Sequence, residues 1–312
     1  MVSFAFVFPG QGSQSVGMLN GWGDHPAVRD TMNEASAALD QDLAALMRDG
    51  PQDELDLTAN TQPVMLCAGI ACYRAWRAEG GAEPAAVAGH SLGEYSALVA
   101  AGVLTLADAL KLVRLRAQAM QQAVPVGTGA MAAVLALEPA QVVEGCAKAM
   151  AESGEVVEAA NFNEPRQTVI SGSVAGVEKA REVLKAMGAK RVVNLPVSAP
   201  FHCSLMRPAA EALRQRLVDV AFAAPRIPLV NNVDVAVHTD ADAIRDALYR
   251  QAFGPVRWVE VVRSLRARGL SHVVECGPGK VLAGMVKRID AELQVGSLHD
   301  PGSLAECKEL LA

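Results

Sequence analysis

The sequence has no uninterrupted apolar stretch of about 20 residues, the length that a helix needs to cross a bilayer, so we expect no membrane-spanning segment. Its first residues also lack the basic start and the cleavage site of a signal peptide. Residues 4–8 are apolar and break at Pro9-Gly10, which predicts a first β-strand. We therefore expect a cytoplasmic protein.

A strong excess of charge of one sign is also missing. The formal net charge is −6 over 312 residues, which provides no strong global field for polyanions or anionic lipids. We expect no nucleic-acid partner and no membrane partner. Any basic docking surface must be local.

Cysteine patterns typical of zinc sites are absent as well. The six cysteines form no C-x-x-C pair and no suitable spacing with histidine; they are Cys67, Cys72, Cys146, Cys203, Cys276 and Cys307. We expect reduced, mostly buried thiols, no metal and no cofactor.

What is present is a large apolar fraction, 51% of the residues, which suits a large domain that carries a smaller one. Short apolar runs that end in glycine or proline turns alternate with periodic alanine- and leucine-rich segments. This pattern predicts an α/β fold on a largely parallel sheet, with candidate strands at 4–8, 85–88, 228–231 and 271–275. Glycine turns end three of these strands, and ligands of such sheets bind beyond the carboxyl ends of strands.

Residues 125–196 show a different order of elements. Strands are predicted at 130–137, 156–161, 167–172 and 190–195, with helices at 138–152 and 174–187. The order β-α-β-β-α-β is typical of a ferredoxin-like fold. We therefore expect an inserted ferredoxin-like α+β small domain at 125–196 and a catalytic domain formed by 1–124 and 197–312.

The segment Gly89-His90-Ser91-Leu92-Gly93 lies between a predicted strand and a predicted helix. This is the context of a nucleophile elbow, in which glycines let strand and helix approach closely. The helix N-terminus places backbone N–H groups near Ser91, where an oxyanion would develop. The alternative is a glycine-rich turn with an incidental serine.

A nucleophilic serine needs a base, and the chain has six histidines: His25, His90, His202, His238, His272 and His299. His90 is adjacent to Ser91, so its side chain should point away from the hydroxyl. His202 lies in an irregular stretch just past the predicted small domain, where loops commonly deliver catalytic groups. The residues alone make His202 a candidate only.

Arg116 lies inside the apolar arc of the predicted helix 107–123, at about 100° per residue. A buried guanidinium is costly unless it is paired, and its planar fork matches a carboxylate. Either an internal Asp or Glu pairs with it or a ligand does, and the residues alone favour the internal salt bridge.

Two further turns follow strands. The turn Pro9-Gly10-Gln11-Gly12 lacks the G-K-[ST] ending of a phosphate loop, and is either a flexible turn or a donor of a backbone N–H to an oxyanion hole. Glu275-Cys276-Gly277-Pro278-Gly279 ends the last predicted strand.

Taken together, these segments resemble the malonyl-CoA:acyl carrier protein transacylases and the related acyltransferase domains of fatty-acid and polyketide synthases. The resemblance runs nearly end to end, and it implies a hydrolase-like α/β domain with a ferredoxin-like insert. It rests on Phe8-Pro9-Gly10-Gln11-Gly12-Ser13-Gln14, Gly89-His90-Ser91-Leu92-Gly93-Glu94-Tyr95, Arg116, Asn161-Phe162-Asn163 with Gly172, His202, and Glu275-Cys276-Gly277-Pro278-Gly279.

The resemblance implies that Ser91 is the nucleophile and His202 its general base. It also implies that Gln11 and Leu92 supply backbone N–H groups to the oxyanion hole, and that Arg116 holds the free carboxylate of the substrate. The reaction would be transfer of malonyl from malonyl-CoA to the phosphopantetheine thiol of an acyl carrier protein, through an acyl-serine.

In this family a main-chain carbonyl orients the histidine, and Gln251 matches the residue that supplies it. Phe201 occupies a position where related polyketide acyltransferases vary with substrate, and a large aromatic there is associated with malonyl. We place Phe201 and His90 on the substrate side of the site. We expect a monomer.

Several alternatives stay open. The residue at 201 is often smaller in the single-enzyme members, which leaves a discrete polyketide-pathway acyltransferase possible. The malonyltransferase subunit of malonate decarboxylase shares these motifs, and a serine thioesterase or esterase would pass the acyl group to water. A catalytically silent scaffold is disfavoured by the intact Ser91, His202 and Arg116.

Overall fold

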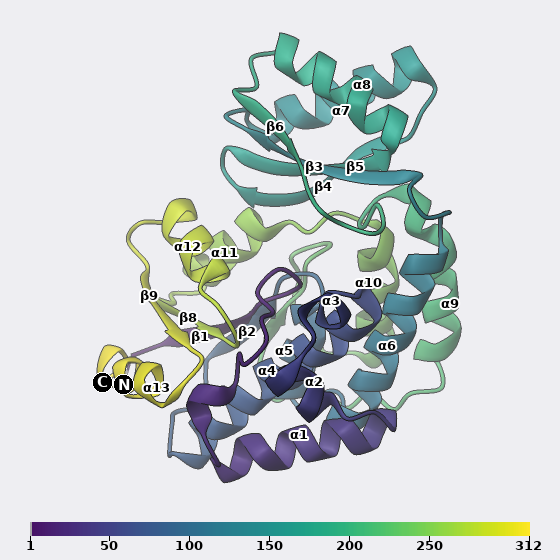
Figure 1. Ribbon diagram of the computed structural model, residues 1–312. Coiled ribbons are helices and arrows are strands. Elements are labelled where there is room, and N and C mark those ends of the chain that lie inside the picture. Colours follow the sequence, from purple (N-terminus) through teal and green to yellow (C-terminus); the bar gives the residue numbers. More distant parts are fainter. Residues whose placement is uncertain (1) are drawn as a thin grey trace.

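The computed structural model describes residues 2–312, which form a larger lobe around a parallel sheet and a smaller lobe around an antiparallel sheet (Figure 1). The predicted α/β fold class is confirmed. The domain boundaries at residues 125 and 196 stay a prediction.

Five parallel strands form the sheet of the larger lobe, in the order β7-β2-β1-β8-β9. They are β1 (Phe4–Phe8), β2 (Ala86–Gly89), β7 (Leu229–Val230), β8 (His272–Cys276) and β9 (Gln294–Leu298). Four of them match predicted strands within one residue at each end. The fifth, β9, was not predicted, because glycine and polar residues interrupt its apolar pattern.

Strand β1 shows why these residues form a central strand. All five of its side chains are buried, as expected for a strand covered on both faces. Phe4, Phe6 and Phe8 pack with the helices on one face, whereas Ala5 and Val7 pack on the other. The phenylalanines contact aromatic rings of helix α4 (Thr58–Ala78) edge to face, at centroid distances of 5.7–6.4 Å.

Helices cover both faces of this sheet (Figure 1). Helices α11 (Trp258–Ala267) and α12 (Val281–Ile289) pack on the face that carries Ala5 and Val7. The other helices of this lobe are α1 (Pro26–Leu39), α2 (Leu43–Asp49), α3 (Gln52–Leu55), α5 (Gly93–Ala100), α6 (Leu106–Gln122), α9 (Arg207–Leu217), α10 (Ala241–Phe253) and α13 (Pro301–Leu310), with 3-10 turns at Asn20–Trp22 and Ser204–Met206.

The smaller lobe has the predicted β-α-β-β-α-β order. Its elements are β3 (Gly129–Leu135), α7 (Pro139–Ser153), β4 (Val157–Glu164), β5 (Gln167–Ser173), α8 (Val174–Ala186) and β6 (Arg191–Asn194). The antiparallel sheet has the order β4-β5-β3-β6, and α7 and α8 pack on its outer face (Figure 1). Its inner face, with Met131 and Val169, packs with Phe201 and faces the larger lobe.

The six cysteines are all buried free thiols, as expected. Within residues 2–312, no helix combines the length and apolar character that a membrane span requires. The same residues contain no cluster of His, Cys, Asp and Glu side chains suited to a metal ion.

Candidate active site

Ser91 lies in the sharp turn between β2, which ends at Gly89, and α5, which begins at Gly93. Its φ is +52°, a conformation that a non-glycine residue adopts only under constraint. A Cβ at Gly89 would lie 1.9 Å from the Gly93 carbonyl carbon, and a Cβ at Gly93 would lie 2.0 Å from the Phe8 carbonyl oxygen. The predicted elbow geometry is therefore present, and both glycines are sterically required.

His202 faces Ser91 from the loop after the small lobe. Its Nε2 lies 2.6 Å from the Ser91 Oγ, and its Nδ1 lies 3.0 Å from the Gln251 carbonyl oxygen and 3.1 Å from that of Gly254. Because carbonyls only accept, Nδ1 carries the proton and Nε2 is free to accept from the serine hydroxyl.

Burial sets the charge state of this histidine. His202 is buried, and burial together with the nearby Arg116 charge lowers its pKa to about 3. The imidazole is thus neutral near pH 7, as a general base must be before it takes a proton.

Arg116 comes from α6 and is 2% exposed. One Nη donates to the Gln62 side-chain oxygen at 2.8 Å, and the other donates to the Gln251 Oε1 at 3.1 Å and the Ser91 Oγ at 3.2 Å. No carboxylate among the described residues lies within ion-pair distance of it. The internal salt bridge that the sequence favoured is therefore wrong, and burial lowers the pKa of Arg116.

Gln11 lines the same cavity as Ser91, and Leu92 follows Ser91 in the chain. The backbone N–H groups of both residues donate no hydrogen bond within residues 2–312. Gln11 lies in the turn after β1, and Leu92 directly precedes α5. These are the two residues that the sequence assigns to an oxyanion hole. Unpaired N–H groups beside a serine hydroxyl are what a developing oxyanion requires.

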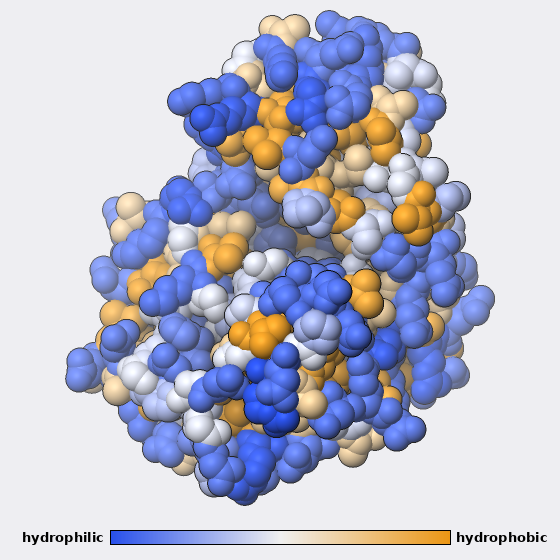
Figure 2. All heavy atoms as spheres, in the orientation of Figure 1, coloured by the Kyte–Doolittle hydropathy of each residue, from blue (hydrophilic) through white to orange (hydrophobic). Residues whose placement is uncertain are grey.

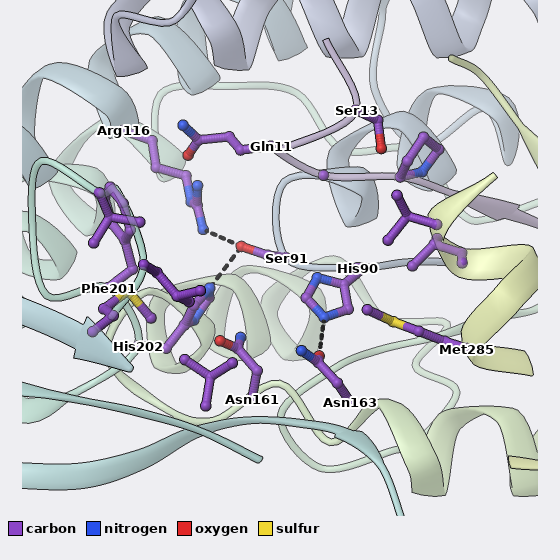
Figure 3. A pocket seen from close by; sticks show the side chains of 18 residues that line it. Gln11, Ser13, His90, Ser91, Arg116, Asn161, Asn163, Phe201, His202 and Met285 are labelled. Atoms are coloured by element: carbon purple, nitrogen blue, oxygen red, sulfur yellow. Dashed lines mark hydrogen bonds between the residues drawn. The ribbon is translucent and has the colours of Figure 1, made fainter. Parts of the chain in front are cut away.

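Both residues expected on the substrate side line the same cavity. Phe201 is half-buried and packs with the inner face of the small sheet. His90 turns away from Ser91, as predicted, and its Nε2 lies 2.8 Å from the Asn163 side-chain oxygen (Figure 3). Its ring also packs edge to face with Trp258.

The cavity has a volume of about 220 Å³ and lies between the two lobes, where the space-filling view is hollowed (Figure 2). Its polar end holds Gln11, Ser91, Arg116 and His202 (Figure 3). The remainder is mostly apolar and includes Met131 of the small sheet and Met285 of α12. A short polar acyl group at one end and a longer ligand along the rest fit this distribution.

Sequence reasoning missed three buried polar residues around the site, which are Gln62, Glu94 and Asn232. Gln62 follows the polar Asn60 and Thr61 and stands just before the apolar run of α4, so no local pattern marked it. Asn232 lies two residues after the end of β7, so it was in reach of the rule that strand ends carry functional groups. Glu94 stands within the elbow motif, but the sequence alone gave it no role.

Six basic residues are candidates for docking an acidic carrier protein: Arg166, Lys190, Arg191, Lys280, Lys287 and Arg288. They divide into two groups. Arg166 pairs with Glu138 at 3.8 Å and Arg288 with Glu164 at 2.7 Å. In contrast, the exposed Lys190, Arg191, Lys280 and Lys287 form no ion pair within the described chain.

The profile of the acyl transferase domain family matches residues 5–296. The chain belongs to the acyl transferase family. It is 52% identical over 311 residues to the malonyl CoA-acyl carrier protein transacylase of Escherichia coli strain K12. The matched region covers 99% of this chain and 100% of the relative.

Solved structures of this acyl transferase family agree. The acyl-carrier-protein S-malonyltransferase from Burkholderia pseudomallei 1710b is 61% identical, with a TM-score of 0.97 over 99% of this chain and 100% of that one. A malonyl-transacylase in complex with its holo type II PKS acyl carrier protein is 46% identical, with a TM-score of 0.96 over 98% of this chain and 99% of that one.

Proposed function

We propose that this acyl transferase moves malonyl from malonyl-CoA to the phosphopantetheine thiol of an acyl carrier protein, supplying extender units for fatty-acid synthesis. The observation that carries the proposal is Arg116, a buried guanidinium with neutral partners only, 3.2 Å from the Ser91 Oγ. An acyl group with a free carboxylate supplies the missing negative charge, whereas acetyl does not.

In the first half-reaction, the Ser91 Oγ attacks the thioester carbonyl and His202 Nε2 takes the hydroxyl proton. The Gln11 and Leu92 N–H groups donate to the oxyanion. The tetrahedral intermediate then expels the coenzyme A thiolate, and His202 returns the proton to this sulfur. Malonyl is left as an ester on Ser91.

The second half-reaction reverses these steps with a different thiol. The phosphopantetheine sulfur of the carrier attacks the ester, and its proton passes to His202. When the intermediate collapses, the Ser91 Oγ leaves and recovers a proton from His202, so the enzyme is regenerated. The Gln251 and Gly254 carbonyls stabilise the transient imidazolium, in the place of a triad carboxylate.

Arg116 also explains why the site would select an acyl group with a free carboxylate over a plain acyl group. A ligand carboxylate bound there fixes the acyl group against Ser91 and satisfies the unpaired charge, whereas a plain acyl group leaves that charge buried and unpaired. A serine thioesterase for plain acyl groups has no use for this arginine.

Turnover with two forms of the carrier tests the proposal. With malonyl-CoA, we expect malonyl to appear on holo acyl carrier protein, and none on the apo form that lacks the phosphopantetheine thiol. Release of free malonate at the same rate without a carrier would support the thioesterase alternative. A Ser91→Ala enzyme, which lacks the proposed nucleophile, is the negative control for both measurements.

A polyketide-pathway carrier is the second candidate acceptor, because the solved transacylase bound to a type II PKS carrier is 46% identical to this chain. Comparing kcat/KM for carriers of the two classes separates them, with the larger value expected for the fatty-acid carrier. We further propose that the protein acts as a cytoplasmic monomer.

A further inference from the structure

The turn that carries Ser91 leaves a main-chain donor that neither sheet nor helix pairs. The side chain of Asn232, about 140 residues away in the chain, meets it: Oδ1 accepts from the Ser91 N–H at 2.7 Å. The same side chain donates from Nδ2 to the Gly89 carbonyl oxygen at 2.6 Å. One amide therefore spans the turn on both sides of His90.

Asn232 is itself held by Glu94, which lies on the first turn of α5. The Asn232 N–H donates to Glu94 Oε2 at 3.0 Å, and the Gln251 Nε2 donates to the same oxygen at 2.9 Å. The Gln251 Nε2 also donates to the Ser91 carbonyl oxygen at 2.9 Å. Glu94 Oε2 thus connects Asn232, which bonds to the serine turn, with Gln251, whose carbonyl oxygen bonds to His202.

The conformation of Ser91 explains why such bonds are needed. A non-glycine residue at φ +52° is strained and persists only where its surroundings hold it. The contact between Ser91 and His202 also depends on the relative placement of two distant loops, and a displacement of about 1 Å costs up to about a hundredfold in rate.

We propose that Asn232 and Glu94 are positioning residues for the acyl transfer, which hold the main chain of the Ser91 turn in register with His202. This inference rests on the proposed function. Neither side chain lines the substrate cavity, so each acts through Ser91 and Gln251 and not on the substrate. Asn suits this position because its short amide offers a donor and an acceptor on separate atoms, one for each side of the turn.

Both residues are almost fully buried, with Asn232 at 0% and Glu94 at 2% exposure. Burial raises the pKa of Glu94 to about 7. Either protonation state keeps an acceptor oxygen for the two N–H donors, so the arrangement needs the oxygen and not the charge.

A phosphonofluoridate that carries no carboxylate measures the reactivity of Ser91 without malonyl or Arg116 pairing. The Ser91 Oγ forms a bond to phosphorus, the phosphorus–fluorine bond breaks, fluoride leaves, and the hydroxyl proton passes to His202. Mass spectrometry gives the labelling rate and the labelled residue. Binding of malonyl-CoA is measured separately, in a Ser91→Ala background.

Asn231 offers a matched control in the same loop. It is also buried, but its side chain bonds to Asp234 and Ala236 and not to the serine turn. Asn231→Ala and Asn232→Ala each lose a buried amide, so both should lower the melting temperature. We expect only Asn232→Ala to slow labelling, by about tenfold or more, with the Kd for malonyl-CoA changed less than about twofold.

Equal labelling rates for Asn232→Ala and wild type, or equal slowing by both alanine variants, would overturn the proposal. Labelling at a residue other than Ser91 in the wild type would instead overturn the acyl-serine function on which it rests. If Asn232→Ala does not fold, Asn232→Leu decides, because it keeps the approximate size of the side chain but loses both the acceptor for the Ser91 N–H and the donor to Gly89. The same slowing is expected of it.

Glu94 is tested by a pair of variants of similar size. Glu94→Gln keeps an acceptor oxygen and should label within about threefold of wild type, whereas Glu94→Leu leaves two buried donors unpaired and should label about tenfold slower or worse. A Glu94→Gln enzyme as slow as Glu94→Leu would contradict the role assigned to the oxygen.

Discussion

At the scale of single residues, the feature that separates this site from a plain serine hydrolase is the partner set of Arg116. Its position in the apolar arc of a helix was visible in the sequence. Its partners were not, because Gln62 and Gln251 come from helices 54 and 135 residues away. These neutral amides orient the guanidinium but do not neutralise its charge, so the site still favours a ligand that carries an anionic group.

Replacing Arg116 with Ala should therefore lower kcat/KM for malonyl-CoA by about a hundredfold and raise the relative use of acetyl-CoA. Competition between the two thioesters for carrier acylation measures the shift. Arg114→Ala is the matched control, since Arg114 lies on the same helix, is half-buried, and bonds to Gln41 outside the cavity. Wild-type selectivity in Arg116→Ala would contradict the assignment.

The pKa of His202, lowered to about 3 from 6.5 by burial first and by the Arg116 charge second, predicts a pH dependence. Acylation should show no acid limb near pH 6.5, because the folded imidazole stays neutral there. Arg116→Gln removes the cation, so the pKa should rise and any acid limb should move to higher pH. Profiles of kcat/KM against pH test both statements, and a wild-type limb at 6.5 would contradict the first.

The same shift has a consequence for stability. The unfolded histidine titrates near 6.5 and the folded one near 3, so the unfolded chain binds more protons between these values. The contribution of His202 to the free energy of unfolding is present above pH 6.5 and falls as the pH drops towards 3.

At the scale of elements, local pattern determined what could be predicted. Strand β1 and the order of the small lobe follow from apolar runs bounded by turns, and both were predicted. The elbow at Ser91 was predicted because its glycines stand in the chain beside the serine. The contacts of Asn232 were not, since its pairing with the turn joins residues about 140 positions apart and leaves no local pattern.

The two elbow glycines make a sharp prediction. Gly89→Ala and Gly93→Ala each place a Cβ within about 2 Å of backbone atoms, contacts that no rotamer change relieves, so we expect a loss above about 4 kcal/mol in the free energy of unfolding or no folded protein. Gly302→Ala, whose Cβ would meet only an Asp300 oxygen at 3.5 Å, should be tolerated. Thermal melts of the three variants decide, and a stable Gly93→Ala enzyme would count against the elbow geometry.

At the scale of the whole molecule, the site belongs to neither lobe alone. The larger lobe supplies the serine, the arginine and the oxyanion donors, while the inner face of the small sheet closes the cavity (Figure 3). We propose that residues 125–196 form the small domain and that 1–124 and 197–312 form the catalytic one, in line with the two separate sheets.

If the carrier protein is acidic, as the family resemblance implies, its docking requires a local basic surface on this negatively charged chain. Four of the candidates are exposed and free of ion pairs within residues 2–312: Lys190, Arg191, Lys280 and Lys287. Because screening shortens the Debye length from about 8 Å at 0.15 M to about 3 Å at 1 M salt, high salt should reduce carrier turnover more than coenzyme A binding. Equal insensitivity of both steps would exclude electrostatic docking.

The central claim is that malonyl passes through an ester on Ser91, and the intact mass of the enzyme after brief exposure to malonyl-CoA tests it most directly. The account predicts a single added malonyl group, mapped by peptide analysis to Ser91, absent from Ser91→Ala and discharged by holo acyl carrier protein. A malonyl adduct that persists in Ser91→Ala, or carrier acylation without any adduct, would contradict it.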